Sequence, residues 1–298
     1  MKILLFGGNG QVGSELRRSL APLGEVVAAT RSGMLEDGAA CETADFDAPD
    51  SLPGLIERIA PDAVVNAAAY TAVDRAEDDA EAAFRANAEA PRAIASACAS
   101  RGALMVHYST DYVFDGGGKR PYRENDPTAP LGAYGVSKLA GEAAVRESGA
   151  RHLIFRTAWV YAAHGKNFLL TMLRLAKERD ELRVVADQIG TPTSARLIAY
   201  ATETALRSRR DSGLWHLTAS GQTSWHGFAE SIVLQAQESG LIARAPKVIP
   251  IATADYPTRA ARPAYSVLDN AAFQRDFGIE LPNWHEGMVQ VLDEIAGF

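Results

Sequence analysis

The chain has 298 residues, of which 47% are hydrophobic and 22% charged, so it is long and apolar enough to bury a sizeable core. It contains 30 Lys and Arg and 37 Asp and Glu. The resulting formal charge of −7 excludes an overall positive field that would attract nucleic acid or an anionic membrane. Cys41 and Cys98 lack paired spacing, which excludes a disulfide framework or a zinc cluster built from them. No segment reaches the roughly 20 apolar residues of a membrane span, and the expected location is the cytoplasm.

The first half of the chain alternates short apolar runs with stretches of helical period, the pattern of βαβ units. The predicted strands are Ile3–Phe6, Val26–Ala29, Ala63–Val65, Leu104–Tyr108 and His152–Phe155. The predicted helices are Val12–Leu20, Leu52–Ile59, Glu77–Phe84, Pro91–Ala99 and Tyr134–Glu147. An α/β fold follows, with a doubly wound parallel (Rossmann) sheet whose ligand crevice lies beyond the carboxyl ends of the strands.

Past about residue 156 the alternation loosens, and segments rich in Pro, Thr, Gly and aromatic residues appear. We therefore expect residues 1–156 to form the dinucleotide-binding domain. Residues 157–298 are expected to form a smaller substrate-binding lobe, interleaved with the last strands and helices of the sheet.

A glycine-rich turn, Gly7–Gly13, lies between the first strand and the first helix. Glycine allows a tight turn and a close approach of a pyrophosphate, and the helix N-terminus offers free N–H groups. The glycines fit two spacings, counted from Gly7 or from Gly8, so the loop alone does not identify a family. The candidate cofactor-binding residues here are Gly7, Gly10, Gln11, Val12 and Gly13.

The second strand ends in Thr30-Arg31-Ser32, where a NAD-specific site would place an acidic residue. Arg31 can make a two-pronged contact with a 2′-phosphate, which favours NADPH and leaves NADH as the alternative; a solvated surface arginine is the other interpretation. After the next loop, Asp45 and Phe46 could border the adenine by a hydrogen bond and an apolar wall. Asp45 is equally typical of a turn.

Tyr134 and Lys138 stand four residues apart on one predicted helix face. A carbonyl that receives hydride on carbon must receive a proton on oxygen, and a phenol can supply it if a nearby ammonium lowers the phenol pKa. Taken alone, the pair also fits a solvated helix face. Upstream, Ser109 and Thr110 end the fourth strand, where a hydroxyl could bind the substrate carbonyl or simply finish the strand.

At these residues the sequence resembles the extended short-chain dehydrogenase/reductase superfamily, and within it the family of dTDP-4-dehydrorhamnose reductases. The segments that carry the resemblance are Gly7–Gly13, Asn66–Asp74, His107–Gly116, Tyr134–Glu142, Arg156–Tyr161, Asn167–Phe168, Asp187–Thr193 and Arg262–Pro263. They span nearly the whole chain, and the Thr-Asp-Tyr and Trp-Val-Tyr segments are much more specific than the glycines.

The resemblance implies NADPH-dependent reduction of the 4-keto group of dTDP-4-dehydro-L-rhamnose to dTDP-L-rhamnose, in nucleotide-sugar and cell-surface polysaccharide biosynthesis. It implies Tyr134 as proton donor, Lys138 as its electrostatic partner and ribose ligand, and Thr110 as the hydroxyl that tunes the tyrosine and touches the sugar. It also implies substrate contacts from Asp111 and Trp159. The residues that it implies along the cofactor path are Ala69, Tyr70, Thr71 and Tyr108.

Other residues of these segments have two interpretations each. Trp159 suits a nucleotide or sugar contact but also a core position, and Arg262 could meet the diphosphate or lie on the surface. Gln188 and Asn167 could line the pocket or cap loops. Asp74 and Glu77 look like acids in the first turn of a helix. The resemblance also suggests Mg²⁺, for which no ligands can be assigned. We expect a homodimer.

Rival functions within the fold differ in their chemistry. Dehydration needs an extra carboxylate after the Thr-Asp pair, and Tyr112 stands there instead. A nucleotide-sugar 4-epimerase uses the same Tyr and Lys and stays open. A non-catalytic NADP-binding regulatory subunit has no need of a proton donor, so Thr110, Tyr134 and Lys138 argue against it.

Overall fold

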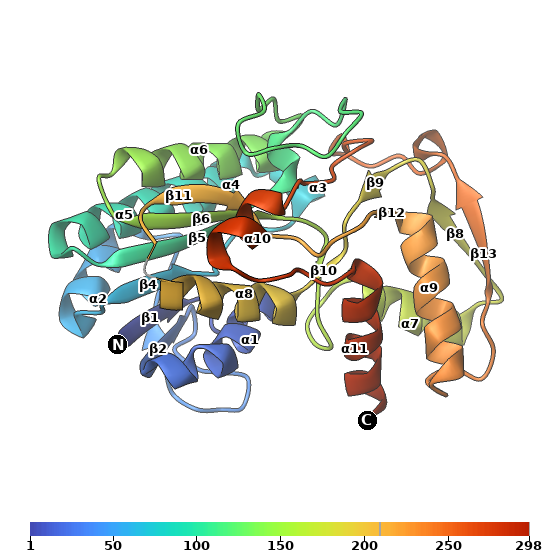
Figure 1. Cartoon of the computed structure of the whole chain (residues 1–298), viewed down its shortest axis with the longest axis horizontal. Coiled ribbons are helices and arrows are strands. Elements are labelled where there is room, and N and C mark those ends of the chain that lie inside the picture. The colour runs from blue at the N-terminus through green and yellow to red at the C-terminus, as the bar shows by residue number, and fades with distance from the viewer. Residues whose placement is uncertain (209, 298) are drawn as a thin grey trace.

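A seven-stranded parallel sheet runs through the larger part of the molecule in the order β11-β6-β5-β4-β1-β2-β3 (Figure 1). The structure is a computed structural model that describes residues 1–208 and 210–297. The strands are β1 (Lys2–Phe6), β2 (Glu25–Thr30), β3 (Glu42–Thr43), β4 (Ala63–Asn66), β5 (Leu104–Thr110), β6 (His152–Thr157) and β11 (Gly213–His216). The direction of winding reverses between β1 and β4, where doubly wound sheets bind ligands. The predicted fold class is confirmed.

Helices cover both faces of this sheet because alternate side chains of each strand point to opposite faces. Ile3 and Leu5 of β1 pack in one hydrophobic core, whereas Leu4 and Phe6 pack in the other. The first core is covered by α1 (Gln11–Ser19), α8 (Ala195–Ser208) and α10 (Ala271–Phe277). The second core is covered by α2 (Leu52–Ile59), α5 (Ala90–Arg101) and α6 (Ala133–Glu147).

The predicted helix over Glu77–Phe84 differs from the structure. The region contains two short helices, α3 (Val73–Ala76) and α4 (Ala80–Phe84), followed by a π-helical turn over Arg85–Glu89. Asp79 separates α3 from α4 with a non-helical backbone, φ −131° and ψ 50°. The acidic side chains before it contact other segments of the chain, which is described below.

A smaller lobe lies beside the sheet, at the right of Figure 1. Its helices are α7 (Phe168–Glu178), α9 (Trp225–Glu238) and α11 (Trp284–Ala296), and its parallel strand pair is β8 (Glu181–Val185) with β13 (Lys247–Ile251). Short pairs join β7 (Val160–Tyr161) to β10 (Thr193–Ser194) and β9 (Ile189–Gly190) to β12 (Thr223–Ser224). A separate core unites Tyr161, Leu169, Phe228 and Met288.

The chain passes between the sheet and the smaller lobe more than once. It returns to the sheet with α8, β11 and α10 before it ends in α11 (Figure 1). The boundary after residue 156 stays a prediction. None of the helices in the described ranges has the length and hydropathy that crossing a membrane requires.

Candidate functional site

The turn after β1 brings the chain into close contact with the end of β4. Gly7 has φ +80°, and a Cβ there would lie 2.7 Å from the backbone N of Ala68, so only glycine fits both the conformation and the space. A Cβ on Gly13 would lie 2.8 Å from the backbone carbon of Gly7, which is why α1 can begin directly over the strand. Gly10 precedes α1 and offers no side-chain cap.

The N-terminus of α1 is open to an anion. Within the described residues, the N–H groups of Gln11, Val12 and Gly13 make no hydrogen bond, whereas Ser14 N donates to Gly10 O at 2.8 Å. First-turn N–H groups that lack partners, together with the helix dipole, bind phosphate groups well. The predicted residues of the glycine turn therefore fit a dinucleotide pyrophosphate.

A cavity of about 190 Å³ lies beside this turn, at the carboxyl ends of β1, β2 and β4. It is lined by Gly7, Ala29, Thr30, Arg31, Ala44, Phe46, Asp47, Ala68, Ala69, Tyr70 and Ala86. The apolar wall and the position suit the adenosine of a dinucleotide. Thr71, also predicted on the cofactor path, is exposed and does not line this cavity.

Arg31 carries two carboxylate partners at the rim of the cavity. Its guanidinium lies 2.8 Å from Asp47 Oδ2 and 3.4 Å from Asp45 Oδ1, and its side chain is 68% exposed. The Asp45 carboxylate also accepts a hydrogen bond from Asp47 N at 3.0 Å, which is the turn role that the sequence left open. Any 2′-phosphate therefore competes with Asp47 for Arg31.

Asn87, which the sequence analysis did not single out, joins the cofactor side to the helix of Tyr134. Its side-chain amide accepts from Tyr70 N at 2.9 Å and donates to Tyr70 O and to Ser137 Oγ, both at 3.0 Å. Ser137 Oγ in turn donates to Tyr134 O. Asn87 lies in the π-helical turn, a distortion frequent at functional sites. No local sequence pattern marks it.

Lys138 is buried against β5, and its Nζ donates to the carbonyl oxygen of Tyr108 at 2.6 Å. Burial lowers the pKa of Lys138 to about 8, and the charge of Glu142 opposes this shift. The side chain of Tyr108 points the other way, into the core, where its hydroxyl lies 2.7 Å from Thr202 Oγ1. Tyr108 thus contacts the site through its backbone only.

Tyr134 is partly exposed, and its ring meets that of Tyr112 edge to face with 5.7 Å between centroids. Burial of the hydroxyl raises the pKa of Tyr134, while a hydrogen bond with Thr110 acts in the opposite direction. The phenol is therefore fully protonated at neutral pH. The Lys138 ammonium donates to the Tyr108 carbonyl, and its effect on the pKa of the Tyr134 phenol stays a prediction.

Thr110 and Ser109 are separated by the alternation of β5. Ser109 Oγ donates to the buried carboxylate of Glu142, which also forms a two-pronged ion pair with Arg156 at 2.7 and 2.8 Å. Thr110 lies on the side of Tyr134, and its hydroxyl donates to Asp111 Oδ1 at 3.0 Å. The structure thus brings Thr110, and not Ser109, to the phenol.

Asp111 is 2% exposed, and its Oδ2 makes no hydrogen bond within the described part of the chain. Burial raises the pKa of Asp111 to about 6, although the nearby hydroxyl groups of Ser266 and Thr110 oppose this. A buried carboxylate oxygen without a partner is costly, and a hydroxyl group of a ligand would satisfy it.

A second cavity, of about 430 Å³, lies between these residues and the smaller lobe. It is lined by Tyr112, Phe168, Thr171, Met172, Leu175, Arg179, Leu182, Arg183, Val184, Val185, Gln188, Trp225, Tyr256, Thr258 and Arg262. The combination of an apolar and aromatic wall with several cationic groups suits an anionic ligand that carries a flat ring. Gln188 therefore has the pocket position that the sequence left open.

Trp159 is not among the lining residues of this cavity, but it is stacked on Trp225, which is, with centroids 3.5 Å apart and planes 5° apart. Its φ of +48° is uncommon for a bulky residue. A Cβ on Gly190 would lie 2.7 Å from Trp159 Nε1, so the indole needs a glycine beside it. Asn167, by contrast, caps α7 by accepting from Leu170 N and donates to Gln11 Oε1 at 2.7 Å.

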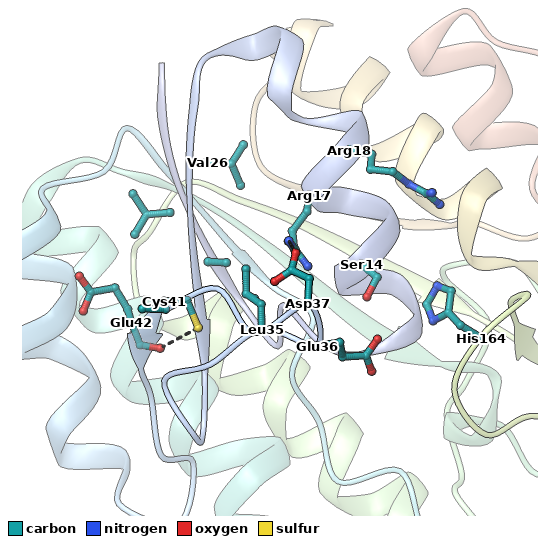
Figure 2. A pocket seen from close by; sticks show the side chains of 13 residues that line it. Ser14, Arg17, Arg18, Val26, Leu35, Glu36, Asp37, Cys41, Glu42 and His164 are labelled. Atoms are coloured by element: carbon teal, nitrogen blue, oxygen red, sulfur yellow. Dashed lines mark hydrogen bonds and ion pairs between the residues drawn. The ribbon is translucent and has the colours of Figure 1, made fainter.

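A further cavity, of about 1000 Å³, lies elsewhere, between α1 and the loop after β2 (Figure 2). In Figure 2 Arg17 points toward Asp37, with which it forms an ion pair, and Cys41 lies beside Glu42. None of the predicted site residues lines it. Among the described residues, no three His, Cys, Asp or Glu side chains gather to hold a metal ion, so the suggested Mg²⁺ still has no ligands.

Comparisons with known proteins agree along the whole chain. The family model described as the RmlD substrate binding domain matches residues 1–296. A dTDP-4-dehydrorhamnose reductase of Burkholderia thailandensis is 53% identical over 294 residues, 95% of this chain and 95% of that protein.

Two solved structures share the fold closely. The crystal structure of a dTDP-4-dehydrorhamnose reductase from Clostridium acetobutylicum has a TM-score of 0.90 at 37% identity and covers 99% of both chains. That of Bacillus anthracis, solved in complex with NADP, has a TM-score of 0.89 at 33% identity over 98% of this chain and 99% of that chain. The chain therefore belongs to the dTDP-4-dehydrorhamnose reductase family, a family of NADPH-dependent oxidoreductases.

Proposed function

We propose that this protein reduces the 4-keto group of dTDP-4-dehydro-L-rhamnose to the alcohol of dTDP-L-rhamnose, with NADPH as the reductant. The observation that carries the proposal is the full-length match to dTDP-4-dehydrorhamnose reductases, joined to a protonated phenol, a threonine hydroxyl and a buried ammonium at the end of β5. That set of groups suits proton transfer to a carbonyl oxygen during its reduction.

Cofactor binding rests on the glycine turn and on the 190 Å³ cavity. The free N–H groups of Gln11, Val12 and Gly13 would hold the pyrophosphate, and Phe46, Ala69 and Tyr70 would border the adenosine. Arg31 would exchange Asp47 for a 2′-phosphate, which is the proposed basis of NADPH preference. NADPH, when bound, supplies the hydride for the carbonyl carbon.

Tyr134 donates the proton in the proposed reaction. As the carbonyl carbon is reduced, negative charge develops on the oxygen, and the neutral phenol transfers its proton there. The hydroxyl proton of Thr110 would turn from Asp111 to the phenolate that remains and stabilise it by a hydrogen bond. Lys138, mostly charged below its pKa of about 8, stabilises the same negative charge from within the buried site and can reach the ribose.

Substrate binding rests on the 430 Å³ cavity. Arg262 would meet the diphosphate, and Asp111 Oδ2 would accept a hydrogen bond from a sugar hydroxyl. The stacked Trp159 and Trp225 offer a flat surface for the sugar or the base. The homodimer and the cytoplasmic location stay predictions, and Mg²⁺ has no part in the proposed steps.

An NADPH oxidation assay with enzymatically generated dTDP-4-dehydro-L-rhamnose tests the proposal. We expect one NADPH consumed per dTDP-L-rhamnose formed, and slower turnover with NADH at equal concentration. A 4-epimerase retains its cofactor, so isomerised sugar without NADPH consumption would favour that rival. Cofactor binding without any turnover of the nucleotide sugar would favour a non-catalytic subunit.

A further inference from the structure

Helix α6, which carries Tyr134, receives its N-terminal cap from a distant residue. The helix begins at Ala133, its N-cap residue Gly132 has no side chain, and its first turn contains no acidic residue. Glu77, which follows α3, fills this gap: its Oε1 accepts a hydrogen bond from Ala133 N at 2.8 Å. One carboxylate thus satisfies a first-turn N–H and places a negative charge at the positive end of the helix dipole.

Gly132 makes room for this contact. A Cβ on Gly132 would collide with Glu77 Oε1, although the backbone of Gly132 is extended, with φ −146°, a conformation that any residue adopts. The glycine therefore leaves the space that the carboxylate occupies, and the backbone conformation does not call for it. This close fit fixes where α6 begins, one residue before Tyr134.

The same segment holds a second part of the chain, which is more distant in the sequence. Asp74 accepts from Ala260 N at 3.1 Å and from Arg262 Nη2 at 2.5 Å. Asp78 forms an exposed ion pair with Arg259. In Figure 1, α3 lies between the N-terminal end of α6 and the orange-red segment that contains Arg259, Ala260 and Arg262. Asp74 is thus a tether for Arg262, which is 21% exposed, rather than only a first-turn acid.

These contacts connect to one another through the proton donor, Tyr134. Arg262 Nη1 donates to the hydroxyl of Tyr112 at 2.9 Å, and the ring of Tyr112 meets the ring of Tyr134 edge to face. Tyr134 returns through the first turn of α6 to Glu77. The phenol is consequently held from two sides, and both sides depend on one segment of five residues, Val73–Glu77.

We propose that Asp74 and Glu77 are positioning residues that together act as a clamp: Glu77 fixes the helix of the proton donor, and Asp74 fixes the arginine that faces the substrate cavity. The clamp rests on the proposed function, because its purpose is to align Tyr134 with a substrate held at Arg262. The two residues are expected to affect different kinetic parameters. Loss of Glu77 disturbs the chemical step, whereas loss of Asp74 disturbs substrate binding.

Three variants test the Glu77 end of the clamp. Glu77→Ala removes the acceptor, Glu77→Gln keeps an acceptor oxygen without the charge, and Glu81→Ala removes an exposed acid of the neighbouring helix as control. We expect kcat to fall about 10-fold to 100-fold in Glu77→Ala, as a small misplacement of a reacting group does, with the KM for the nucleotide sugar nearly unchanged. Glu77→Gln should recover most of the loss, and Glu81→Ala should match the unaltered protein.

Asp74→Ala tests the other end, and there we expect the KM for the nucleotide sugar to rise about 10-fold with a smaller change in kcat. Hydrogen exchange of the amides at 131–138 gives a readout that needs no turnover. Glu77→Ala should speed exchange in this first turn and Glu77→Gln should do so less, even if the proposed function were wrong. Unchanged exchange in Glu77→Ala, or equal losses of kcat in Glu77→Ala and Glu77→Gln at unchanged exchange, would overturn the clamp.

Discussion

In residues 1–156 the groups of the site either follow strands β1, β2, β4 and β5 or lie on α6 beside β5, whereas in residues 157–298 they come mainly from helices and loops of the smaller lobe. The first set is positioned by the register of one parallel sheet, whose carboxyl ends meet at one edge. The second set is positioned by side-chain contacts between segments far apart in the sequence, such as Asp74 with Arg262 and Trp159 with Trp225.

This difference separates two kinds of sensitivity. A change in the sheet region that disturbs a buried polar network should cost stability, because the same groups hold β5, α6 and β6 together. A change in the smaller lobe should alter substrate affinity at little cost in stability, because its contacts with the sheet region are partly exposed. The following variants break or sharpen this contrast.

Glu142→Ala should give the largest loss of stability. It leaves Arg156 buried without its partner and removes the acceptor of Ser109. Breaking a buried ion pair on one side costs about 3–5 kcal/mol of unfolding free energy. Urea denaturation measures it, with Glu178→Ala, which breaks the exposed pair with Arg174, as control at about 0–1 kcal/mol. A loss below 1 kcal/mol in Glu142→Ala would refute the role of the buried pair.

Asp111→Asn should stabilise the protein while it weakens substrate binding. The pKa of Asp111 is raised from 3.8 to about 6, so the folded state holds this proton more tightly than the unfolded state does. Wild-type stability therefore falls as the pH rises through the window from about 4 to about 6, by up to roughly 3 kcal/mol at 1.36 kcal/mol per pKa unit.

Denaturation of wild type and Asp111→Asn at several pH values checks this. The gain of the variant should be full at pH 7 and absent below about pH 4, because the wild-type carboxyl is then neutral in both states. A gain that does not depend on pH would show that burial of the charge is not its cause. The KM for the nucleotide sugar should rise in the variant.

Arg31→Ala should change the choice of cofactor and little else. Loss of a charge-assisted contact with the 2′-phosphate is worth about 1.5–3 kcal/mol, so the NADPH over NADH ratio of kcat/KM should fall about 10-fold to 100-fold. Asp47→Asn should raise the same ratio, because it frees Arg31 from its competing partner. A ratio unchanged in both variants would assign Arg31 to the solvated surface.

Trp225→Leu should give the smallest effect. It removes the ring on which Trp159 is stacked, and we expect the KM for the nucleotide sugar to rise a few fold, roughly the 0.5–1.5 kcal/mol of an aromatic pair. Near-ultraviolet circular dichroism reports the indole pair directly. A KM that stays constant while this signal is lost would show that the stack does not prepare Trp159 for substrate.

The sequence predicts what local patterns determine and misses what distant contacts determine. The glycine turn, Thr110 and the Tyr134 helix were predictable because strand alternation and helical spacing are patterns that extend over only a few neighbouring residues. The two-residue strand β3 was too short for such a pattern, and β11 lies in the half where the alternation loosens.

Polar contacts between segments far apart in the sequence could not be predicted, for the same reason. Glu77 reads as an ordinary first-turn acid until Ala133 is brought beside it, and Asn87 stands in an alanine-rich stretch without any motif. The pKa of Tyr134 depends on how deeply its hydroxyl is buried and on its hydrogen bond with Thr110. Neither follows from a spacing of four residues.

The transfer of the proton by Tyr134 is the central claim, and single-turnover reduction by Tyr134→Phe tests it most directly. The variant keeps the ring and its contact with Tyr112 and removes only the hydroxyl, while Tyr200→Phe, at an exposed tyrosine outside the site, is the control. We predict that hydride transfer slows at least about 100-fold in Tyr134→Phe, with the Kd for NADPH unchanged and Tyr200→Phe at the wild-type rate. A wild-type rate in Tyr134→Phe would contradict the account.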